Sequence, residues 1–291
     1  MDNKISFCIL GGDKRQVRLA QSICDDGYKV YAVGFDDIEF EQGIVKENLD
    51  DGVSKGKYVI LPVNPVKGNK LNVVYSNREI YIDEKFCNLL EGKKVFTGLS
   101  NTLVSANKAF KNIDLLDYSK KEDFKIKNAV PTVEAALMIA IRESERTIEG
   151  SRCLVTGFGR LGKAMSRILG NLGASVSVSA RKERDWANIK LCGFDPVVTE
   201  RIIDDLDYDI IFNTIPSVIF EEKALKRMRK DTILIDLASL PGGVDFNKAR
   251  ELNLNVIQAL ALPGKFSPQR AGEIIKETIY SMIEEEGLWV K

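Results

Sequence analysis

A glycine-rich motif with the spacing of a dinucleotide-binding loop occurs in the second half of the chain. It comprises Gly157, Phe158, Gly159, Arg160, Leu161 and Gly162, after the apolar run 153–156 and before an amphipathic stretch. In such motifs the first glycine permits a tight turn and the second lets the backbone approach a pyrophosphate at the helix N-terminus. The third lets the helix pack closely on the strand. We predict that this segment binds a nicotinamide dinucleotide, with Arg160 adding to the phosphate contacts.

The end of the next predicted strand indicates which dinucleotide is bound. A strand that binds NAD normally ends in Asp or Glu, whose carboxylate binds the ribose hydroxyls. Here the strand ends in Ser179, Ala180, Arg181 and Lys182, and the first acid is Glu183. A serine and two cations suit the dianionic 2′-phosphate of NADP. We therefore predict NADP, with NAD as the alternative cofactor, although Arg181 as a merely solvated cation is a second interpretation.

Two further segments should lie at the same edge of the sheet. Ligands bind outside the carboxyl ends of parallel strands, near the point where the strand order reverses. Residues 213–216 end one predicted strand and residues 237–239 end the next. We predict that the ribose and nicotinamide contact a set of residues in these segments: Thr214, Ile215, Pro216, Ala238 and Ser239. For each of them, a role in the turn alone is the alternative.

The first half of the chain has its own strand-to-helix turn, Gly11-Gly12-Asp13-Lys14-Arg15-Gln16. It lacks the third glycine of a dinucleotide loop, but it places two cations and an acid at a helix N-terminus. Backbone N–H groups and Arg15 there would bind a carboxylate well. The alternative is that Asp13 caps the helix while Lys14 and Arg15 face solvent. Asn64 and residues 100–102 either line the same site or form turns.

Strand-like and helix-like segments alternate along the whole chain. The predicted strands are residues 5–10, 29–35, 58–63, 94–97, 153–156, 174–181, 208–216, 232–239 and 255–262. This alternation predicts an α/β fold with two Rossmann-like domains, whose parallel sheets are separated by a cleft and joined by a long helix.

The charged stretch 120–128 is the predicted domain boundary. It separates an N-terminal flavodoxin- or Rossmann-like domain for substrate or partner (1–128) from an NAD(P)-binding Rossmann domain (129–291). The long helix is predicted to start after Pro131, with Thr132 as its cap. A last helix, roughly 269–285, is expected to return to the first domain.

The composition excludes several classes of function. The 291 residues are 44% hydrophobic and 29% charged, and 42 basic side chains balance 42 acidic ones. We therefore expect neither a nucleic-acid nor a membrane partner. Histidine is absent, which removes His-based catalysis and His-type zinc sites. The five widely spaced cysteines suggest buried thiols in a reducing cytoplasm, and no metal site is predicted. Neither a spanning helix nor a signal peptide is expected.

Seven segments together resemble the A-subunit family of dipicolinate synthase, the sporulation enzyme of endospore-forming bacteria. They extend from about Ile5 to Ile275 and read GGDKRQ, YKVYAVGF, GLSN, VTGFGRLGKA, NTIP, IDLASLPGGVD and LPGKFSPQRAG. The glycine motif alone would not carry this resemblance, whereas the set is specific.

The resemblance implies an oxidation of dihydrodipicolinate to dipicolinate (pyridine-2,6-dicarboxylate) in the mother cell of a sporulating bacterium. The B-subunit of dipicolinate synthase, similar to flavoproteins, would act with the A-subunit, which is expected to carry the nicotinamide cofactor. Because the substrate is a dicarboxylate, we expect Arg15 and Lys14 to bind it, with Lys265 as a further cation and Asp13 as the proton acceptor. Lys265 is alternatively a surface residue.

Two other functions remain open from the sequence. One is a non-catalytic, nucleotide-binding regulatory subunit. The other is an NADP-dependent dehydrogenase of another small carboxylic acid, although hydroxy-acid dehydrogenases usually use a His that this chain lacks. The oligomeric state is also open, and a homo-oligomer is compatible with the sequence.

Overall fold

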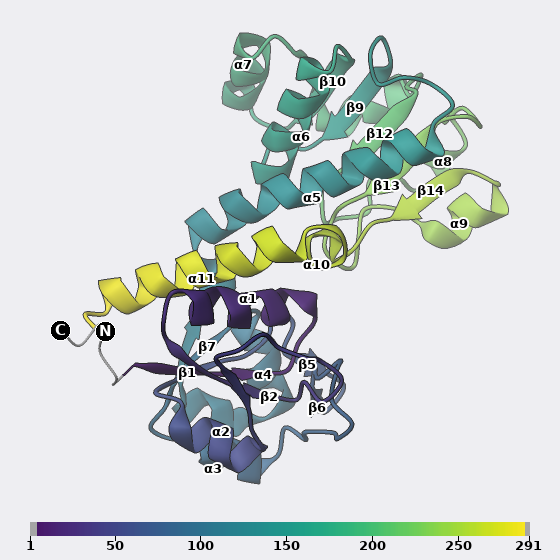
Figure 1. Ribbon diagram of the computed structural model, residues 1–291. Coiled ribbons are helices and arrows are strands. Elements are labelled where there is room, and N and C mark those ends of the chain that lie inside the picture. Colours follow the sequence, from purple (N-terminus) through teal and green to yellow (C-terminus); the bar gives the residue numbers. More distant parts are fainter. Residues whose placement is uncertain (1–4, 289–291) are drawn as a thin grey trace. The chain divides into compact units, whose positions relative to one another are not determined.

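The computed structural model describes residues 5–288, and the chain divides into two compact units. Unit 1 contains the chain up to Asn128 and again from Pro263 onward, and unit 2 contains Ala129–Leu262. Helix α5 (Glu122–Glu143) carries the chain from unit 1 into unit 2 (Figure 1). Each unit has its own sheet and its own hydrophobic core.

Unit 1 is built on a six-stranded parallel sheet with the order β3-β2-β1-β4-β7-β8. Its strands are β1 (Ser6–Leu10), β2 (Lys29–Val33), β3 (Ile44–Lys46), β4 (Tyr58–Ile60), β7 (Lys94–Thr97) and β8 (Asp114–Asp117). Strand β1 is central, since Phe7 is in register with Val30 on one side and with Tyr58 on the other. The strand order therefore reverses between β1 and β4, as in doubly wound folds.

Helices cover both faces of this sheet. They are α1 (Lys14–Asp25), α2 (Leu49–Lys55), α3 (Glu84–Leu90), α4 (Ser100–Ala106) and α11 (Pro268–Glu285), and the short helix α10 (Leu262–Phe266) precedes α11. One core contains α1 and α11, and the other contains α2, α3 and α4. Helix α11, yellow in Figure 1, packs along α1, where its buried Ile275 and Ile279 join Leu19 and Ile23. A two-stranded hairpin, β5 (Val66–Lys67) and β6 (Lys70–Leu71), and two short 3-10 turns complete the unit.

Unit 2 repeats the same topology with the strand order β11-β10-β9-β12-β13-β14. Its strands are β9 (Arg152–Thr156), β10 (Ser175–Ala180), β11 (Asp195–Val198), β12 (Ile210–Asn213), β13 (Ile233–Asp236) and β14 (Asn255–Gln258). One face is covered by α5, α6 (Arg160–Asn171) and α7 (Glu183–Leu191). The other face is covered by a 3-10 helix (Thr199–Asp204), α8 (Glu222–Leu225) and α9 (Phe246–Glu251). The prediction of two Rossmann-like units with parallel sheets is confirmed.

Several predicted details are wrong. Helix α5 begins at Glu122 rather than after Pro131, and Pro131 lies inside it. Two acids in its first turn favour the earlier start, whereas sequence periodicity does not mark the polar first turns of a helix. The short strands β3, β8 and β11 were not predicted from the sequence.

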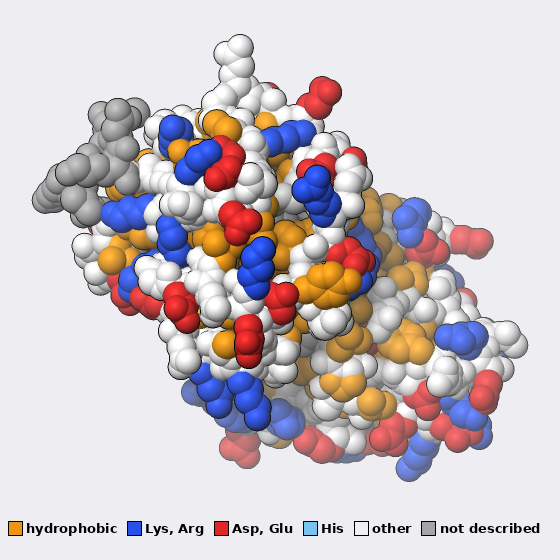
Figure 2. All heavy atoms as spheres, turned by 90° about the horizontal axis from the view of Figure 1, so that it is seen from below, with side chains coloured by type: hydrophobic (Ala, Val, Ile, Leu, Met, Phe, Trp, Pro, Cys, Tyr) orange, Lys and Arg blue, Asp and Glu red, His pale blue; other side chains and the backbone are white. Residues whose placement is uncertain are grey.

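The surface carries both signs of charge. On the face drawn in Figure 2, basic and acidic side chains lie among one another. The basic run 226–230 is largely satisfied within the unit, since Arg229 pairs with Asp207, Asp209 and Asp231. Within residues 5–288, no helix is both long and apolar enough to cross a membrane.

Candidate functional site

The glycine loop of unit 2 connects the central strand β9 to α6. Its helix N-cap is Gly159, which has extended backbone angles and provides no side-chain cap. An added Cβ at Gly159 would meet no other atom within 4 Å, so the space beside it is open. The first-turn N–H groups of a helix have no intrahelical acceptor. An anion would therefore meet open space at a helix N-terminus that Gly159 does not cap.

The other two glycines are required by the tight turn itself. Gly157 has a φ of +88°, and a Cβ there would lie 2.8 Å from Thr214 Oγ1. A Cβ on Gly162 would lie 1.9 Å from the carbonyl oxygen of Gly157. Gly162 thus packs against the turn rather than against the strand alone. Phe158 is half-buried, with the Lys163 ammonium 5.1 Å above its ring.

Of the residues predicted to bind the 2′-phosphate, two are exposed and one is buried. Arg181 and Lys182 directly follow β10 and are exposed. Within residues 5–288, the Arg181 side chain has no hydrogen bond or ion pair, and no acid occupies the end of the strand. Ser179, in contrast, is fully buried, and its Oγ accepts a hydrogen bond from the Gly157 N–H at 3.1 Å. Ser179 therefore supports the glycine loop from below and is not placed to contact a phosphate.

The remaining predicted cofactor residues lie at the carboxyl ends of β12 and β13. The Thr214 hydroxyl donates to the carbonyl oxygen of Thr156 at 2.7 Å, which ties it to the end of β9. Pro216 and Ser239 are exposed, whereas Ala238 is buried and offers only its backbone. Since β9 and β12 are neighbours where the strand order reverses, these loops and the glycine loop share one edge of the sheet.

Sequence reasoning missed the residues beneath these loops. Thr156, Asn213 and Asp236 are the last residues of β9, β12 and β13, and all three are fully buried. Their side chains form one hydrogen-bonded chain, Thr156 to Asn213 to Asp236. A signal was present in the sequence: each is a polar residue that ends an apolar run.

In unit 1, the turn 11–16 is closed by its own side chains. Asp13 caps α1 and forms a capping box with Gln16. The Asp13 carboxylate also takes a two-pronged ion pair from Arg15, with Nε–Oδ1 at 2.9 Å and Nη2–Oδ2 at 2.8 Å. The Asp13 side chain is 32% exposed and the Arg15 side chain 12%. The position predicted for a substrate carboxylate on Arg15 thus holds a carboxylate of the chain itself.

This pairing changes the role that Asp13 can have. Burial raises the pKa of the Asp13 carboxyl, but the hydrogen bonds and charge of Arg15 outweigh it and leave the pKa below its ordinary value. A carboxylate with a lowered pKa is a weak base, which argues against Asp13 as the proton acceptor. Its geometry suits the orientation of Arg15 instead.

The motif that contains Lys265 lies next to this pair. A Cβ added to Gly264 would be 3.0 Å from both Arg15 Nε and Asp13 Oδ2. Lys14 and Lys265 are exposed. The structure therefore brings residues 13–15 and 264–265 of unit 1 together.

The other predicted residues of unit 1 act in turns. The Asn64 carbonyl oxygen accepts a hydrogen bond from Asn72. The Ser100 N–H donates to Asp117 Oδ2 at 2.8 Å, and the Thr102 hydroxyl donates to the carbonyl oxygen of Leu99. These contacts support the turn interpretation of residues 100–102.

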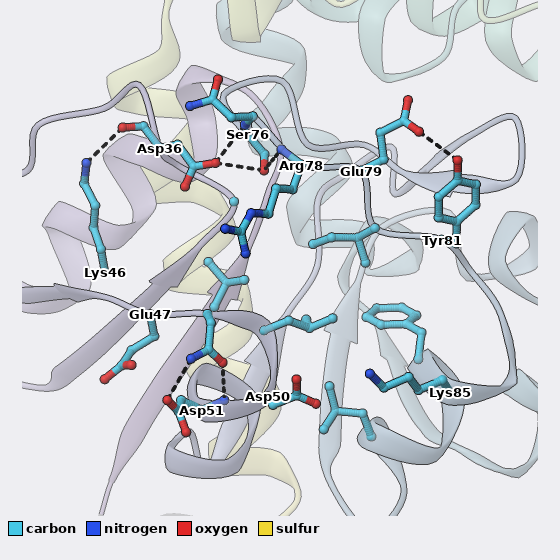
Figure 3. A pocket seen from close by; sticks show the side chains of 18 of the residues that line it. Asp36, Lys46, Glu47, Asp50, Asp51, Ser76, Arg78, Glu79, Tyr81 and Lys85 are labelled. Atoms are coloured by element: carbon cyan, nitrogen blue, oxygen red, sulfur yellow. Dashed lines mark hydrogen bonds between the residues drawn. The ribbon is translucent and has the colours of Figure 1, made fainter.

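A pocket of unit 1 contains none of the predicted site residues. It has a volume of about 1170 Å³ and is lined by the ends of β2 and β3 and by residues 76–89. Figure 3 shows the Arg78 guanidinium reaching into its middle, while Asp36 is held by Ser76 and Asn77 at its upper edge. A smaller pocket of unit 2, about 870 Å³, lies beside α6 and includes Phe158 and Lys163.

The cysteines do not behave as a catalytic group. Cys8 and Cys153 are buried, and burial raises the pKa of each thiol to about 12. Cys87 is also buried, but Cys24 is half-buried and Cys192 is exposed, so the prediction of buried thiols is only partly right.

Comparisons with known proteins found relatives of both units. Residues 6–119 match the family described as the N-terminal domain of the dipicolinate synthase A-subunit. Residues 132–240 match "D-isomer specific 2-hydroxyacid dehydrogenase, NAD binding domain". The chain is 33% identical to the dipicolinate synthase A-subunit of Bacillus subtilis (strain 168), over 97% of this chain and 96% of the relative.

Solved structures show the same relationship. The crystal structure of the dipicolinate synthase A-subunit from Bacillus halodurans matches with a TM-score of 0.87 and 30% identity, over 96% of this chain and 97% of that one. D-lactate dehydrogenase from Escherichia coli shares the fold alone, with a TM-score of 0.60 and 13% identity over 97% and 98% of the two chains.

Unit 2 is an NAD-binding Rossmann domain, and its open glycine loop places the chain among the nicotinamide-dependent oxidoreductases. Together with the match of unit 1 and the full-length relative, this shows that the chain belongs to the A-subunit family of dipicolinate synthase.

Proposed function

We propose that this chain is the nicotinamide-dependent A-subunit of a dipicolinate synthase, which oxidises dihydrodipicolinate to dipicolinate together with a flavoprotein-like B-subunit. The observation that carries the proposal is the uncapped, open glycine loop within a chain related to the A-subunit family over 97% of its length. The proposed enzyme would act in the cytoplasm of the mother cell of a sporulating bacterium.

The residues of unit 2 fit a nicotinamide dinucleotide, with NADP preferred over NAD. The N-terminus of α6 and the open space at Gly159 suit the pyrophosphate. Arg181, with Lys182 beside it, provides the unpaired cation that a 2′-phosphate needs, and no acid stands there to bind a ribose 2′-hydroxyl. Residues 214–216 and 238–239 would hold the ribose and nicotinamide at the same edge.

The reaction removes one hydride from a ring carbon and one proton from a neighbouring ring atom of dihydrodipicolinate. When bound, oxidised NADP supplies the hydride acceptor, so that the products are dipicolinate, reduced NADP and a proton. Because the ring becomes aromatic, no strong base is required, which agrees with a chain that has no histidine.

In unit 1 we propose that Arg15 binds one carboxylate of the substrate, with Lys14 and Lys265 as further cations. Asp13 then orients the Arg15 guanidinium before the substrate arrives, and it is not proposed as the base. Asp13 occupies Nε and Nη2 of Arg15, so the substrate either displaces it from these groups or binds at Nη1. Loss of Arg15 removes a charge-assisted pair, which costs roughly 2–4 kcal/mol. We therefore expect Arg15→Ala to raise KM for dihydrodipicolinate about 30-fold or more.

The proposal is tested by dipicolinate formation, followed by ultraviolet absorbance. The purified chain receives freshly made dihydrodipicolinate with NADP or NAD, with and without the B-subunit, against a control without protein. Product that depends on nucleotide, and forms fastest with NADP, is the expected result.

Each alternative function has its own outcome in this assay. If Gly159→Asp abolishes nucleotide binding but turnover with the B-subunit is unchanged, this chain has a regulatory role. Nucleotide binding without any oxidation above the control would indicate another carboxylic acid as the substrate.

A further inference from the structure

Asp236 is a fully buried carboxylate at the last position of β13. Its two oxygens accept three hydrogen bonds from neutral N–H groups. Oδ1 accepts from Asn213 Nδ2 at 2.7 Å and from the Ala238 N–H at 3.2 Å, and Oδ2 accepts from the Gly243 N–H at 3.0 Å. Within the described part of the chain, no Lys or Arg side chain bonds to Asp236. A buried carboxylate is costly unless such donors are held in place around it.

The partner of Asp236 connects it to two other strand ends. Asn213 Nδ2 also donates to the carbonyl oxygen of Ile215, and Asn213 Oδ1 accepts from the Ile215 N–H. The Thr156 hydroxyl donates to the same Oδ1. The ends of β9, β12 and β13 are therefore joined under the edge where the glycine loop begins.

The 237–243 loop packs tightly against the hydrogen-bonded side chains of Asn213 and Asp236. A Cβ added to Gly243 would be 2.0 Å from Asn213 Nδ2 and 2.8 Å from the Ile215 carbonyl oxygen. The Asn213 side chain and the 237–243 loop are thus in direct contact. The loop residues held in this way include Ile215 and Ala238, which sequence analysis assigned to the cofactor.

From these contacts we propose that Asp236 is a positioning residue: through Asn213 and the 237–243 loop, it fixes residues 214–216 and 238–239 in the conformation that binds the nicotinamide nucleotide. The inference rests on the proposed nucleotide-dependent function. This position requires hydrogen-bond acceptors, because each of its three neighbours donates an N–H hydrogen bond to it. Asparagine has nearly the same shape but turns one amide N–H₂ against an N–H donor.

The test compares Asp236→Asn with a matched variant of the same unit, Asp245→Asn. Asp245 caps α9 by accepting a hydrogen bond from the Lys248 N–H at 2.9 Å, and its side chain takes no part in the Asp236 network. The NADPH dissociation constant is measured from the fluorescence of the nucleotide, and thermal unfolding is followed without nucleotide. In the full enzyme, KM for NADP and kcat are measured separately.

We expect Asp236→Asn to weaken NADPH binding about ten-fold or more in folded protein, whereas Asp245→Asn leaves it within about two-fold. KM for NADP should rise more than kcat falls. Thr156→Val removes the far end of the network, together with the hydroxyl that accepts from the Thr214 N–H, and should weaken binding by about three-fold. It keeps the inference testable if Asp236→Asn does not fold.

Wild-type affinity in folded Asp236→Asn, or in Thr156→Val where the first variant fails to fold, would overturn the inference. An equal loss in Asp245→Asn would also overturn it, because general destabilisation would then explain the effect. A wild-type chain that binds NADPH but forms no dipicolinate would overturn the proposed reaction and leave the positioning role intact. A wild-type chain that binds no nucleotide would overturn both.

Discussion

The two strand–glycine–helix turns of this chain are similar in sequence and local structure, but only the turn of unit 1 has a side chain that caps its helix. In unit 1, Asp13 and Gln16 cap α1, and Arg15 closes on Asp13. In unit 2, α6 starts at Gly159 with no side-chain cap and with open space beside it. The difference shows that a helix N-terminus becomes a candidate anion site when the chain leaves its donors unfilled.

The strand that follows each turn shows a second contrast. Beyond β2, the carboxylate of Asp36 is engaged by the Ser76 hydroxyl and the Asn77 N–H. Beyond β10, Arg181 is exposed and has no partner within residues 5–288. Unit 1 thus satisfies its polar groups internally at both positions, and unit 2 leaves both available to a ligand.

The largest effect is expected when the open turn is converted into a closed one. Gly159 has φ −81° and ψ −162°, close to the −106° and −164° of Asp13, so Gly159→Asp can cap α6 as Asp13 caps α1. We expect unchanged or slightly higher thermal stability and a loss of NADPH affinity of about 100-fold or more, because a carboxylate repels the pyrophosphate. Nucleotide fluorescence and thermal unfolding measure the two effects.

Gly159→Ala is the control for that variant, since its methyl group meets no atom within 4 Å. It should fold like the wild type and lose less affinity than Gly159→Asp. Normal nucleotide binding by Gly159→Asp would remove the α6 turn from the site.

The second-largest effect is expected for a change of Arg181, which follows strand β10 of unit 2. Arg181→Asp supplies the carboxylate that NAD-binding strands carry and removes the cation proposed for the 2′-phosphate. We expect NADP to bind roughly 50-fold more weakly and NAD to bind as well or better, measured as dissociation constants for both nucleotides. Lys182→Ala is the neighbouring control and should change the NADP-to-NAD ratio less. A ratio unaffected by Arg181→Asp would contradict the assignment of NADP.

A further variant breaks the Arg15–Asp13 ion pair in the turn of unit 1. Asp13→Asn keeps a capping side chain but removes the negative charge from Arg15. If substrate and Asp13 compete for Arg15, the variant should bind dipicolinate about ten-fold more tightly than the wild type, as measured by calorimetry. Weaker binding would show that the substrate does not compete with Asp13 for Arg15.

The smallest effect is a pH dependence of stability. Since the folded pKa of Asp13 lies below the ordinary value of 3.8, its pairing stabilises the fold above that pH. The stabilisation is lost as the pH falls through the lower, folded pKa. The difference in unfolding free energy between wild type and Asp13→Asn should therefore shrink between about pH 5 and pH 2. A constant difference in denaturant titrations would show that the ion pair contributes little.

Much of the fold could be predicted from local patterns, because strands and helices leave a periodicity and glycines mark turns. Strand β7 was predicted at its observed bounds, Lys94–Thr97, and β1, β2 and β10 were predicted within a few residues. Strands β3, β8 and β11 were missed because they are short and only partly buried. Pro131 misled the prediction of α5, since a proline usually marks a helix start and here lies inside one.

The sequence by itself determined the alternation of strands and helices, the glycine loop and the cation at Arg181. All of these depend on residues that are neighbours in the chain. Only the tertiary structure decided that Ser179 lies under the loop, that Gly264 approaches Arg15, and that Asp236 bonds to Asn213. These contacts join distant segments, and they exist because the strand order places β9, β12 and β13 side by side and α11 along α1. Adjacency of that kind follows from packing and topology, which no local pattern encodes.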